Sequence, residues 1–238
     1  GLALPYVQWL LLDDENPVSV RKSLGLAREN ARGAREAITR EVFLDLNESH
    51  HELDRLSVNI PSNPVDALDE VGRTHRSIRT ILGAIEHTLS RDEGWDFMKL
   101  GEAVERTECT LWILGARLPH LENLDSSDLP VLHALWRALL RSTASLENYR
   151  AMNGPGMDPD ALLRFLFFEP TAPRSIRCGM MRIVRYLARL PSSGPGDEAQ
   201  RVVGHLEAKL HYDAENILQE TGPVDFCLEA RQMLRISH

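Results

Sequence analysis

The sequence predicts an all-α fold, a helical bundle of about six to eight helices with an internal two-fold duplication. Three observations support this fold. Aromatic residues make up only 6% of the 238 residues, whereas Ala, Leu, Arg and Glu are abundant, and straight-chain side chains lose little rotamer freedom in a helix. Apolar residues recur at spacings of three and four, without sustained alternation of period two. Finally, a segment near the start of the chain recurs in its second half.

The first helix is expected to begin at Asn16-Pro17, because Asn caps helices and Pro is tolerated at the first helical position. Its apolar positions continue to about Leu56, where IPSNP (60–64) interrupts the pattern. A helix of this length is typical of the spine of a bundle.

Further helices are expected over 65–89, 94–118, 130–152, 158–168, 173–190, 198–220 and 224–236. Pro119 should end the second of these, and NGPGMDP (153–159) is the strongest break in the chain. Short connections favour antiparallel neighbours. We expect one domain over residues 1–238. Because the chain opens at Gly1 without Met, we also expect it to be a fragment of a longer polypeptide.

The repeat pairs WLLLDDENPVSVR (9–21) with FLFFEPTAPRSIR (165–177) without a gap. Both copies have four apolar residues, an acid, and then proline, serine, an aliphatic residue and arginine at matching positions. A recurrent helix–loop–helix connection would explain part of this pattern, but the shared identities favour duplication. A site is then expected in a groove near the axis that relates the two halves.

Composition excludes several classes of function. The net charge is −8 with acids and bases interleaved, so no binding to nucleic acid or anionic membranes is expected. The longest apolar runs, 9–12 and 162–168, are too short for a membrane span of about 20 residues. The three cysteines lack Cys-x-x-Cys spacing, which argues against a disulfide framework and favours a cytoplasmic location.

No metal site is predicted. His50-His51-Glu52 and the pair His205 and His211 resemble ligand clusters, but adjacent histidines on a helix point about 100° apart and a spacing of six also separates the two side chains. The sequence also lacks a Gly-x-Ser-x-Gly motif, a phosphate-binding glycine loop and a His-Glu-x-x-His motif.

Glu105 is the most informative charge of the 94–118 helix. It falls in a row with Met98, Gly101, Cys109 and Trp112, beside an apolar face of Phe97, Leu100, Val104, Thr107, Leu111, Leu114 and Leu118. We therefore expect Glu105 to be shielded from solvent and paired with an arginine from another element, since Arg106 aligns with Glu102. Such a pair can belong to a site or can simply fix helix register.

Two stripes mark the expected first helix. The basic stripe is Arg21, Arg28, Arg32 and Arg35, and the second is Asn30, Glu41 and Glu48. Both stripes can be solvated faces. Alternatively, the basic stripe can bind a carboxylate or a phosphate, because the planar guanidinium group of arginine suits both anions.

Trp95 lies just inside the start of the 94–118 helix. Ser90 or Asp92 is expected to cap that helix, with acids in its first turn. Trp95 is therefore placed where it can line a pocket.

Several segments together resemble the bacterial alpha-E domain family. They are Trp9–Ser19, Ala27–Arg32, Arg91–Thr110, Trp136–Arg150 and Phe165–Arg177. The resemblance implies an all-helical domain that is found beside, or fused to, ATP-grasp carboxylate–amine ligases, often with transglutaminase-like peptidases. Such systems make or modify amide-linked peptides. Members usually begin with a further helix that carries a similar Glu-Arg motif, which this chain lacks, and an arginine that often follows the second motif is replaced by Trp112.

The resemblance places the family's Glu-Arg motif at Glu105-Arg106. Glu105 is the candidate catalytic residue, as a proton acceptor or as the counter-charge to an amine. The candidate substrate-binding residues are Arg28, Asn30, Arg32, Glu41, Trp95, Arg106 and Arg174. No cofactor is expected on this domain, and ATP and Mg²⁺ are expected on the partner ligase. The alternative is a noncatalytic interaction bundle with structural Glu–Arg pairs; an independent amide hydrolase has less support, because no nucleophile and base can be paired.

Overall fold

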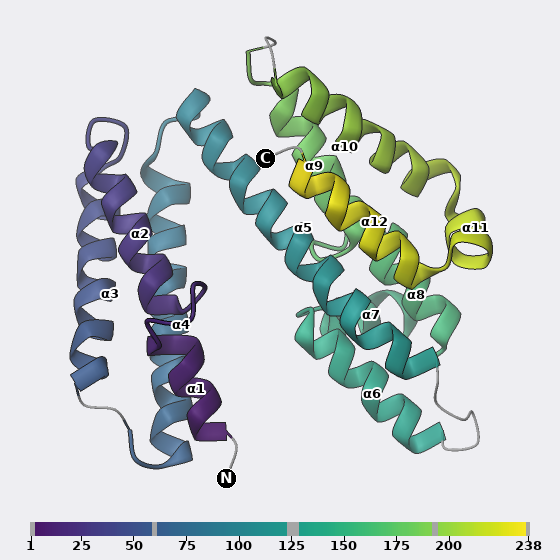
Figure 1. Cartoon of the computed structure of the whole chain (residues 1–238), viewed down its shortest axis with the longest axis horizontal. Helices are drawn as coiled ribbons and strands as arrows, with labels where there is room; N and C mark the ends of the chain where they lie inside the picture. The colour runs from purple at the N-terminus through teal and green to yellow at the C-terminus, as the bar shows by residue number, and fades with distance from the viewer. Residues whose placement is uncertain (1–2, 59–60, 123–128, 192–194, 237–238) are drawn as a thin grey trace. The chain divides into compact units, whose positions relative to one another are not determined.

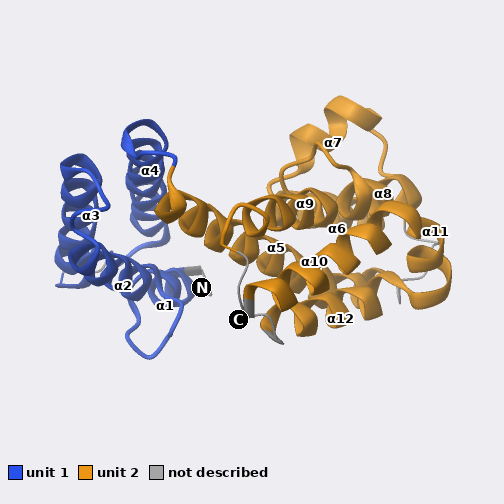
Figure 2. Ribbon diagram, turned by 90° about the horizontal axis from the view of Figure 1, so that it is seen from above, with its two compact units in different colours: residues 1–91 blue, residues 92–238 orange. Residues whose placement is uncertain are grey.

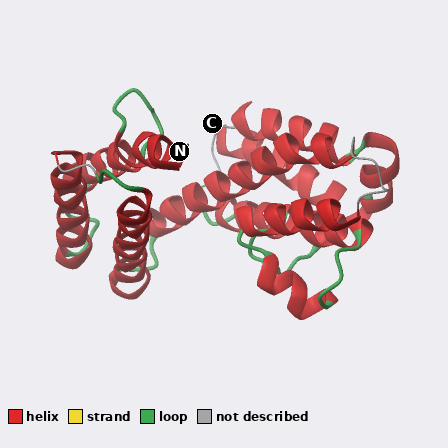
Figure 3. Cartoon of the chain, turned by 90° about the horizontal axis from the view of Figure 1, so that it is seen from below, coloured by secondary structure: helices red, strands yellow, loops and turns green. Residues whose placement is uncertain are grey.

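The structure, a computed structural model, describes residues 3–58, 61–122, 129–191 and 195–236. Every regular element in these ranges is a helix (Figure 3), which confirms the all-α prediction. The described residues form twelve α-helices and one short π-helix, more than expected. The chain divides into two compact units, residues 1–91 and 92–238 (Figure 2). That both units make one domain stays a prediction.

Unit 1 contains α1 (Ala3–Leu12), α2 (Val20–Gly33), α3 (Arg40–Val58) and α4 (Pro64–Thr88). Within it, α2 packs along α3, α3 along α4, and α1 against α4 (Figure 1). Aliphatic side chains fill its interior: Leu11, Leu12, Leu24, Ala31, Val42, Leu46, Leu53 and Ile81. Asn63 caps α4, because its Oδ1 accepts hydrogen bonds from the N–H groups of Val65 and Asp66 at 3.1 and 3.0 Å.

The single long helix expected from Asn16 to about Leu56 is wrong. Its helical start lies at Val20, because Ser19 rather than Asn16 is the N-cap. Residues 34–39 then turn the chain back, so that α2 and α3 pack against each other. This packing buries the apolar stripe of each helix, which one straight helix could not do by itself.

Unit 2 is built around α5 (Glu93–Glu122), which packs against α9 (Ile176–Leu187) and α12 (Pro223–Ile236). Its other elements are α6 (Leu129–Ser142), α7 (Leu146–Asn153), α8 (Pro159–Phe168), α10 (Pro195–Tyr212), α11 (Ala214–Asn216) and the π-helix (Ile217–Thr221). Large side chains from several helices are fully buried here, among them Leu111, Leu114, Leu162, Phe167, Met180 and Phe226.

Three predicted boundaries in unit 2 differ from the structure. Pro119 lies inside α5 rather than ending it, and Leu118 and Leu121 on either side of it are buried, so packing stabilises the last turns. The segment expected as one helix over 130–152 is interrupted at Ala144, whose φ of 50° is left-handed and incompatible with a continuous α-helix. The segment expected over 198–220 leaves α-helical geometry after Tyr212.

The two copies of the repeat have the same local structure. In each, a helix (α1 or α8) ends, the chain turns, and a serine caps the next helix (α2 or α9). The Ser19 N–H donates to the Asn16 carbonyl at 3.1 Å, and the Ser175 N–H donates to the Ala172 carbonyl at 3.0 Å. Each serine Oγ then accepts from the N–H three residues later, at 3.4 Å in the first copy and 3.1 Å in the second.

No helix within the described ranges combines the length and the apolar character that a bilayer crossing requires.

Candidate functional site

Glu102 is the centre of a charged cluster on α5. Its carboxylate accepts hydrogen bonds from Lys99 Nζ and Arg106 Nη2, and the side chains of Glu102 and Arg106 are each 28% exposed. Burial by itself raises the pKa of the Glu102 carboxyl, but the hydrogen bond from Lys99 and the charges of Lys99, Arg106 and Arg182 outweigh it, so the pKa lies below its usual value. Glu102 is therefore held as a carboxylate.

Close contact between α5 and α9 brings Arg182 to this cluster. A Cβ at position 179 would lie 2.1 Å from Thr107 Oγ1 and 3.1 Å from Thr107 Cβ, which real side chains do not tolerate. Gly179 thus allows α9 to approach α5 at Thr107. Arg182 follows one turn later on α9, where its charge acts on Glu102.

Arg174 reaches the same cluster from the connection between α8 and α9. Its side chain is half-buried. Burial lowers the pKa of the Arg174 guanidinium and the charge of Arg106 lowers it further, whereas Cys109, Glu105 and Glu102 act in the opposite direction. Because the net shift is downward, the folded chain holds this cation at a cost to stability.

We call Lys99, Glu102, Glu105, Arg106, Arg174 and Arg182 the Glu-Arg site. Four cations surround two carboxylates, so the site has a net positive charge. Guanidinium groups in such a setting suit a carboxylate or phosphate. The structure therefore brings three sequence-predicted residues together: Glu105, Arg106 and Arg174.

Glu105 itself is exposed, so the prediction that it is shielded from solvent is wrong. The other exposed members of its row are Gly101, Cys109 and Trp112. The predicted apolar face of α5 is confirmed at Thr107, Leu111, Leu114 and Leu118, which are buried, and Ala103 is buried beside them. Phe97, expected in the core, is 54% exposed. Helix α9 packs against the buried face of α5 at Gly179. The residue pattern within α5 does not predict this contact.

The alignment of Arg106 with Glu102 was predicted correctly, since the two form an ion pair. Arg174 is a cation from another element whose charge interacts with Glu105. Glu105 therefore stands at the open side of the site, next to a positive charge.

Trp95 supports the Glu-Arg site without lining an open pocket. Trp95 is 6% exposed. Its backbone N–H donates a hydrogen bond to Oδ1 of Asp92, which caps the helix, at 3.0 Å. Lys99 Nζ lies 5.3 Å from the centre of the Trp95 ring, within the range of a cation–π contact. Trp95 therefore helps to position Lys99.

The remaining candidate residues belong to unit 1. Arg28 Nε donates to Asn47 Oδ1 at 2.5 Å, and Glu29 lies 3.6 Å from Arg28 and 3.0 Å from Arg32. Asn30 and Glu41 are exposed on separate helices. The expected continuous stripes do not form, because the chain turns between α2 and α3. Ligand binding by these residues stays a prediction.

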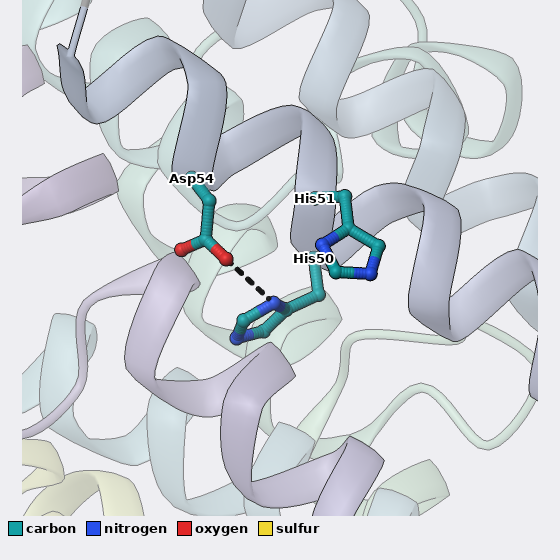
Figure 4. Close-up of side chains that lie close together, drawn as sticks. All are labelled: His50, His51 and Asp54. Atoms are coloured by element: carbon teal, nitrogen blue, oxygen red, sulfur yellow. Dashed lines mark ion pairs between the residues drawn. The ribbon is translucent and has the colours of Figure 1, made fainter.

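His50, His51 and Asp54 of α3 form a separate cluster (Figure 4). One possible ligand atom of each lies within 4.8 Å of the others, and the two imidazole centroids are 5.9 Å apart despite their diverging helical positions. The third member is Asp54, whose Oδ2 lies 3.1 Å from His50 Nδ1, rather than Glu52. Arg21 Nε contacts the other Asp54 oxygen at 3.1 Å. This permanent positive charge disfavours a cation at the cluster.

Sequence reasoning missed Lys99 and Arg182, and it assigned the central position to Glu105 rather than Glu102. Lys99, Glu102 and Arg106 have the usual spacing of ion pairs on one helical face. This spacing could have identified Lys99 as a member of the site and Glu102 as its centre. Arg182 carries no comparable signal, because only the packing of α9 places it near α5.

Comparison with known proteins identifies the family. The Alpha-E family, described as a predicted alpha-helical domain with a conserved ER motif, matches residues 4–236. The dipeptide Glu-Arg occurs once in this chain, at Glu105-Arg106. This dipeptide belongs to the Glu-Arg site.

Curated relatives come from mycobacteria, and their names describe them as uncharacterized proteins. A protein of Mycobacterium bovis and one of Mycobacterium tuberculosis are each 23% identical over 244 residues, which cover 98% of this chain and 26% of the relative. The chain thus spans about a quarter of the length of these relatives. No solved structure matches it at a comparable level of significance.

Proposed function

This chain belongs to the Alpha-E family, and on that premise we propose that it works with an ATP-grasp carboxylate–amine ligase in making or modifying amide-linked peptides. In this proposal the Glu-Arg site holds a carboxylate of the acid or peptide substrate. The ligase supplies ATP and Mg²⁺. A transglutaminase-like peptidase is a further proposed partner.

The residues of the Glu-Arg site suit the two ends of an amide-forming reaction. The guanidinium groups of Arg174 and Arg106 can bind a carboxylate through paired hydrogen bonds. The exposed Glu105 can meet the amine, which must lose a proton as it attacks the activated carboxyl group. Glu105 either accepts that proton or holds the amine as an ammonium ion. Glu102 is already bonded to Lys99 and Arg106, and it keeps Arg106 in place.

The single observation that carries the proposal is the unfavourable position of Arg174. A half-buried guanidinium next to Arg106 costs stability, as its lowered pKa indicates. Charges held in such positions are frequently functional. An anionic ligand would relieve the repulsion between the two guanidinium groups.

Reconstituted amide synthesis with the cognate ATP-grasp ligase tests this proposal. Arg174→Ala and Glu105→Gln should each abolish product formation while helicity is retained and the melting temperature does not fall, because neither residue is part of the core. Arg185→Ala, which removes an exposed arginine of α9, is the matched control and should make product normally. Normal turnover by Arg174→Ala would exclude the proposed role of the site.

The second candidate function is a noncatalytic interaction bundle. Other acid–base pairs of unit 2 connect separate elements, such as Glu108 with Arg235 at 2.8 Å and Asp96 with Arg189 at 3.2 Å. On this alternative, substitutions at the Glu-Arg site lower the melting temperature more than they lower ligase output. The same assay therefore distinguishes the two functions.

The proposed location is the cytoplasm, where an ATP-dependent partner has its nucleotide. Cys109, Cys178 and Cys227 are free thiols. Burial raises the pKa of Cys227 to about 12, which makes this thiol unreactive.

A further inference from the structure

A cavity of about 570 Å³ lies in unit 1, mainly between α3 and α4. This volume falls within the range of small-molecule sites. None of the residues that line it belongs to the Glu-Arg site or to the candidate binding residues inferred from sequence. Ligand binding at this cavity is therefore separate from the proposed function and does not depend on it.

Two buried hydroxyl groups line this cavity. Ser49 on α3 is 5% exposed and Thr74 on α4 is 9% exposed. Other hydroxyls of the same unit donate to carbonyls of their own helix, as Ser57 does to Asp54 at 2.7 Å and Thr88 to Ala84 at 2.7 Å. Ser49 and Thr74 make no such bond to any residue that the structure describes. Both hydroxyls line the cavity, where a ligand can accept hydrogen bonds from them.

Both signs of charge surround these hydroxyls. Glu52 and Glu70 line the cavity together with Arg55, Arg73 and Arg76. Glu70 is paired with Arg73, and Glu52 accepts a hydrogen bond from Ser77 at 3.0 Å. Arg76 has no ion-pair partner within the described ranges. The lining therefore offers partners of both signs, and the guanidinium of Arg76 is available to a ligand carboxylate.

Leu24, Leu53 and Leu56 form an apolar part of the cavity wall, beside Arg55 and the hydroxyl side chains of Ser77 and Thr80. An aliphatic side chain fits against such a wall, because its burial removes apolar surface from water. The combination of the Arg76 guanidinium, two acids, the hydroxyls of Ser49 and Thr74 and an apolar part of the wall matches an aliphatic zwitterion.

We propose that the cavity between α3 and α4 binds an aliphatic amino acid or dipeptide in its zwitterionic form. The ligand carboxylate pairs with Arg76 and accepts hydrogen bonds from Ser49 and Thr74. Its ammonium group lies toward Glu52 and Glu70, and its side chain packs on the leucines.

Titration of the full chain with the dipeptide Ala-Leu, followed by amide chemical shifts and calorimetry, tests this proposal. Saturable binding with shifts at Ser49 and Thr74 is expected. N-acetyl-Ala-Leu, which lacks the ammonium group, and Ala-Leu amide, which lacks the carboxylate, should both bind more weakly. Arg76→Ala should weaken Ala-Leu binding about tenfold or more, the usual effect of losing a charged hydrogen bond.

Arg79→Ala is the matched control, because Arg79 is an exposed arginine of α4 outside the cavity. It should bind Ala-Leu as the unmodified chain does. Absence of saturable binding would overturn the proposal, as would equal affinity for the two capped peptides. Tighter binding of inorganic phosphate than of Ala-Leu would also overturn it, because the cavity would then be a simple anion site. No ligase is present in this assay, so its outcome is independent of the amide-synthesis test.

Discussion

The two copies of the repeat share a local backbone structure, but two pairs of matched positions in and next to them have different surroundings. Val18 of the first copy is 70% exposed, whereas the matching Arg174 of the second copy is half-buried near Arg106. Two residues beyond the copies, the exposed Ser23 of α2 matches Gly179 of α9, where α9 meets α5. The same capped turn thus serves two purposes. In the first copy it only begins a helix, and in the second it also delivers a cation and a close helix contact to the Glu-Arg site.

The largest difference is expected at the matched positions Gly179 and Ser23. Gly179→Ala should lower the free energy of unfolding by about 3 kcal/mol, the upper end for overpacking, because the new methyl group collides with Thr107. Ser23→Ala should change it by less than about 0.5 kcal/mol, as is usual for exposed positions. Urea unfolding of both variants measures the contrast. A Gly179→Ala variant as stable as the unmodified chain would show that α5 and α9 are not in close contact.

The second-largest effect on stability is expected at Glu102 of the Glu-Arg site. Glu102→Gln should lower stability at neutral pH by about 2 kcal/mol, because Lys99 and Arg106 lose a charged acceptor. The folded-state pKa of Glu102 is lowered from 4.5, so its contribution is complete above that pH and is lost as the pH falls through the folded-state value. The difference between variant and unmodified chain should therefore shrink in acid.

Unfolding curves measured at a series of pH values check this prediction. Glu147→Gln, whose carboxylate side chain is 83% exposed, is the control and should show little change at any pH. A Glu102→Gln deficit that persists unchanged in acid would mean that the carboxylate charge is not what stabilises the cluster.

The shared part of the two copies should give smaller and similar effects. Ser19→Ala and Ser175→Ala should each cost about 1 kcal/mol, because both remove an N-cap. The cost at Ser175 should be the larger one, since its Oγ also donates to the Glu169 carbonyl. Thermal unfolding of each variant tests this. A cost confined to one serine would contradict a common turn.

The smallest effect is expected from copying the arginine into the first copy. Val18→Arg should change stability by less than about 0.5 kcal/mol, because position 18 is exposed. Calorimetric melting of this variant measures the change. A large loss of stability would show that position 18 is more confined than its exposure indicates.

The sequence predicted what depends on local pattern and missed what depends on packing between helices. Apolar spacing located α4, α8 and α12 closely, and the repeat identified two turns that do share a structure. The turn after Gly33 was missed, because apolar spacing is nearly continuous across it. The buried face of α5 was predicted at Thr107, Leu111, Leu114 and Leu118. The contact of Thr107 with Gly179 was not predicted, because the two residues lie 72 positions apart in the chain.

The same division holds for the candidate site. Glu105 was singled out from its row on the helix and again from the motif resemblance, Arg106 and Arg174 were among the candidate binding residues, and the structure brings their charges together. The cavity in unit 1 was not found, because its hydroxyls and charges are divided between α3 and α4. Ser49 and Glu52 on one helix and Thr74 and Ser77 on the other each have helical spacing, but only their juxtaposition makes a cavity.

Carboxylate binding by Arg174 is the central claim, and titration with N-acetyl-glutamate tests it most directly. The unmodified chain should bind this probe saturably, with chemical shift changes at Glu105 and Arg174. Arg174→Ala should weaken binding about tenfold or more, Arg174→Lys should recover only part of it because a lysine lacks the planar fork, and Arg185→Ala should bind normally. Equal binding by Arg174→Ala and the unmodified chain, with both folded, would contradict the account.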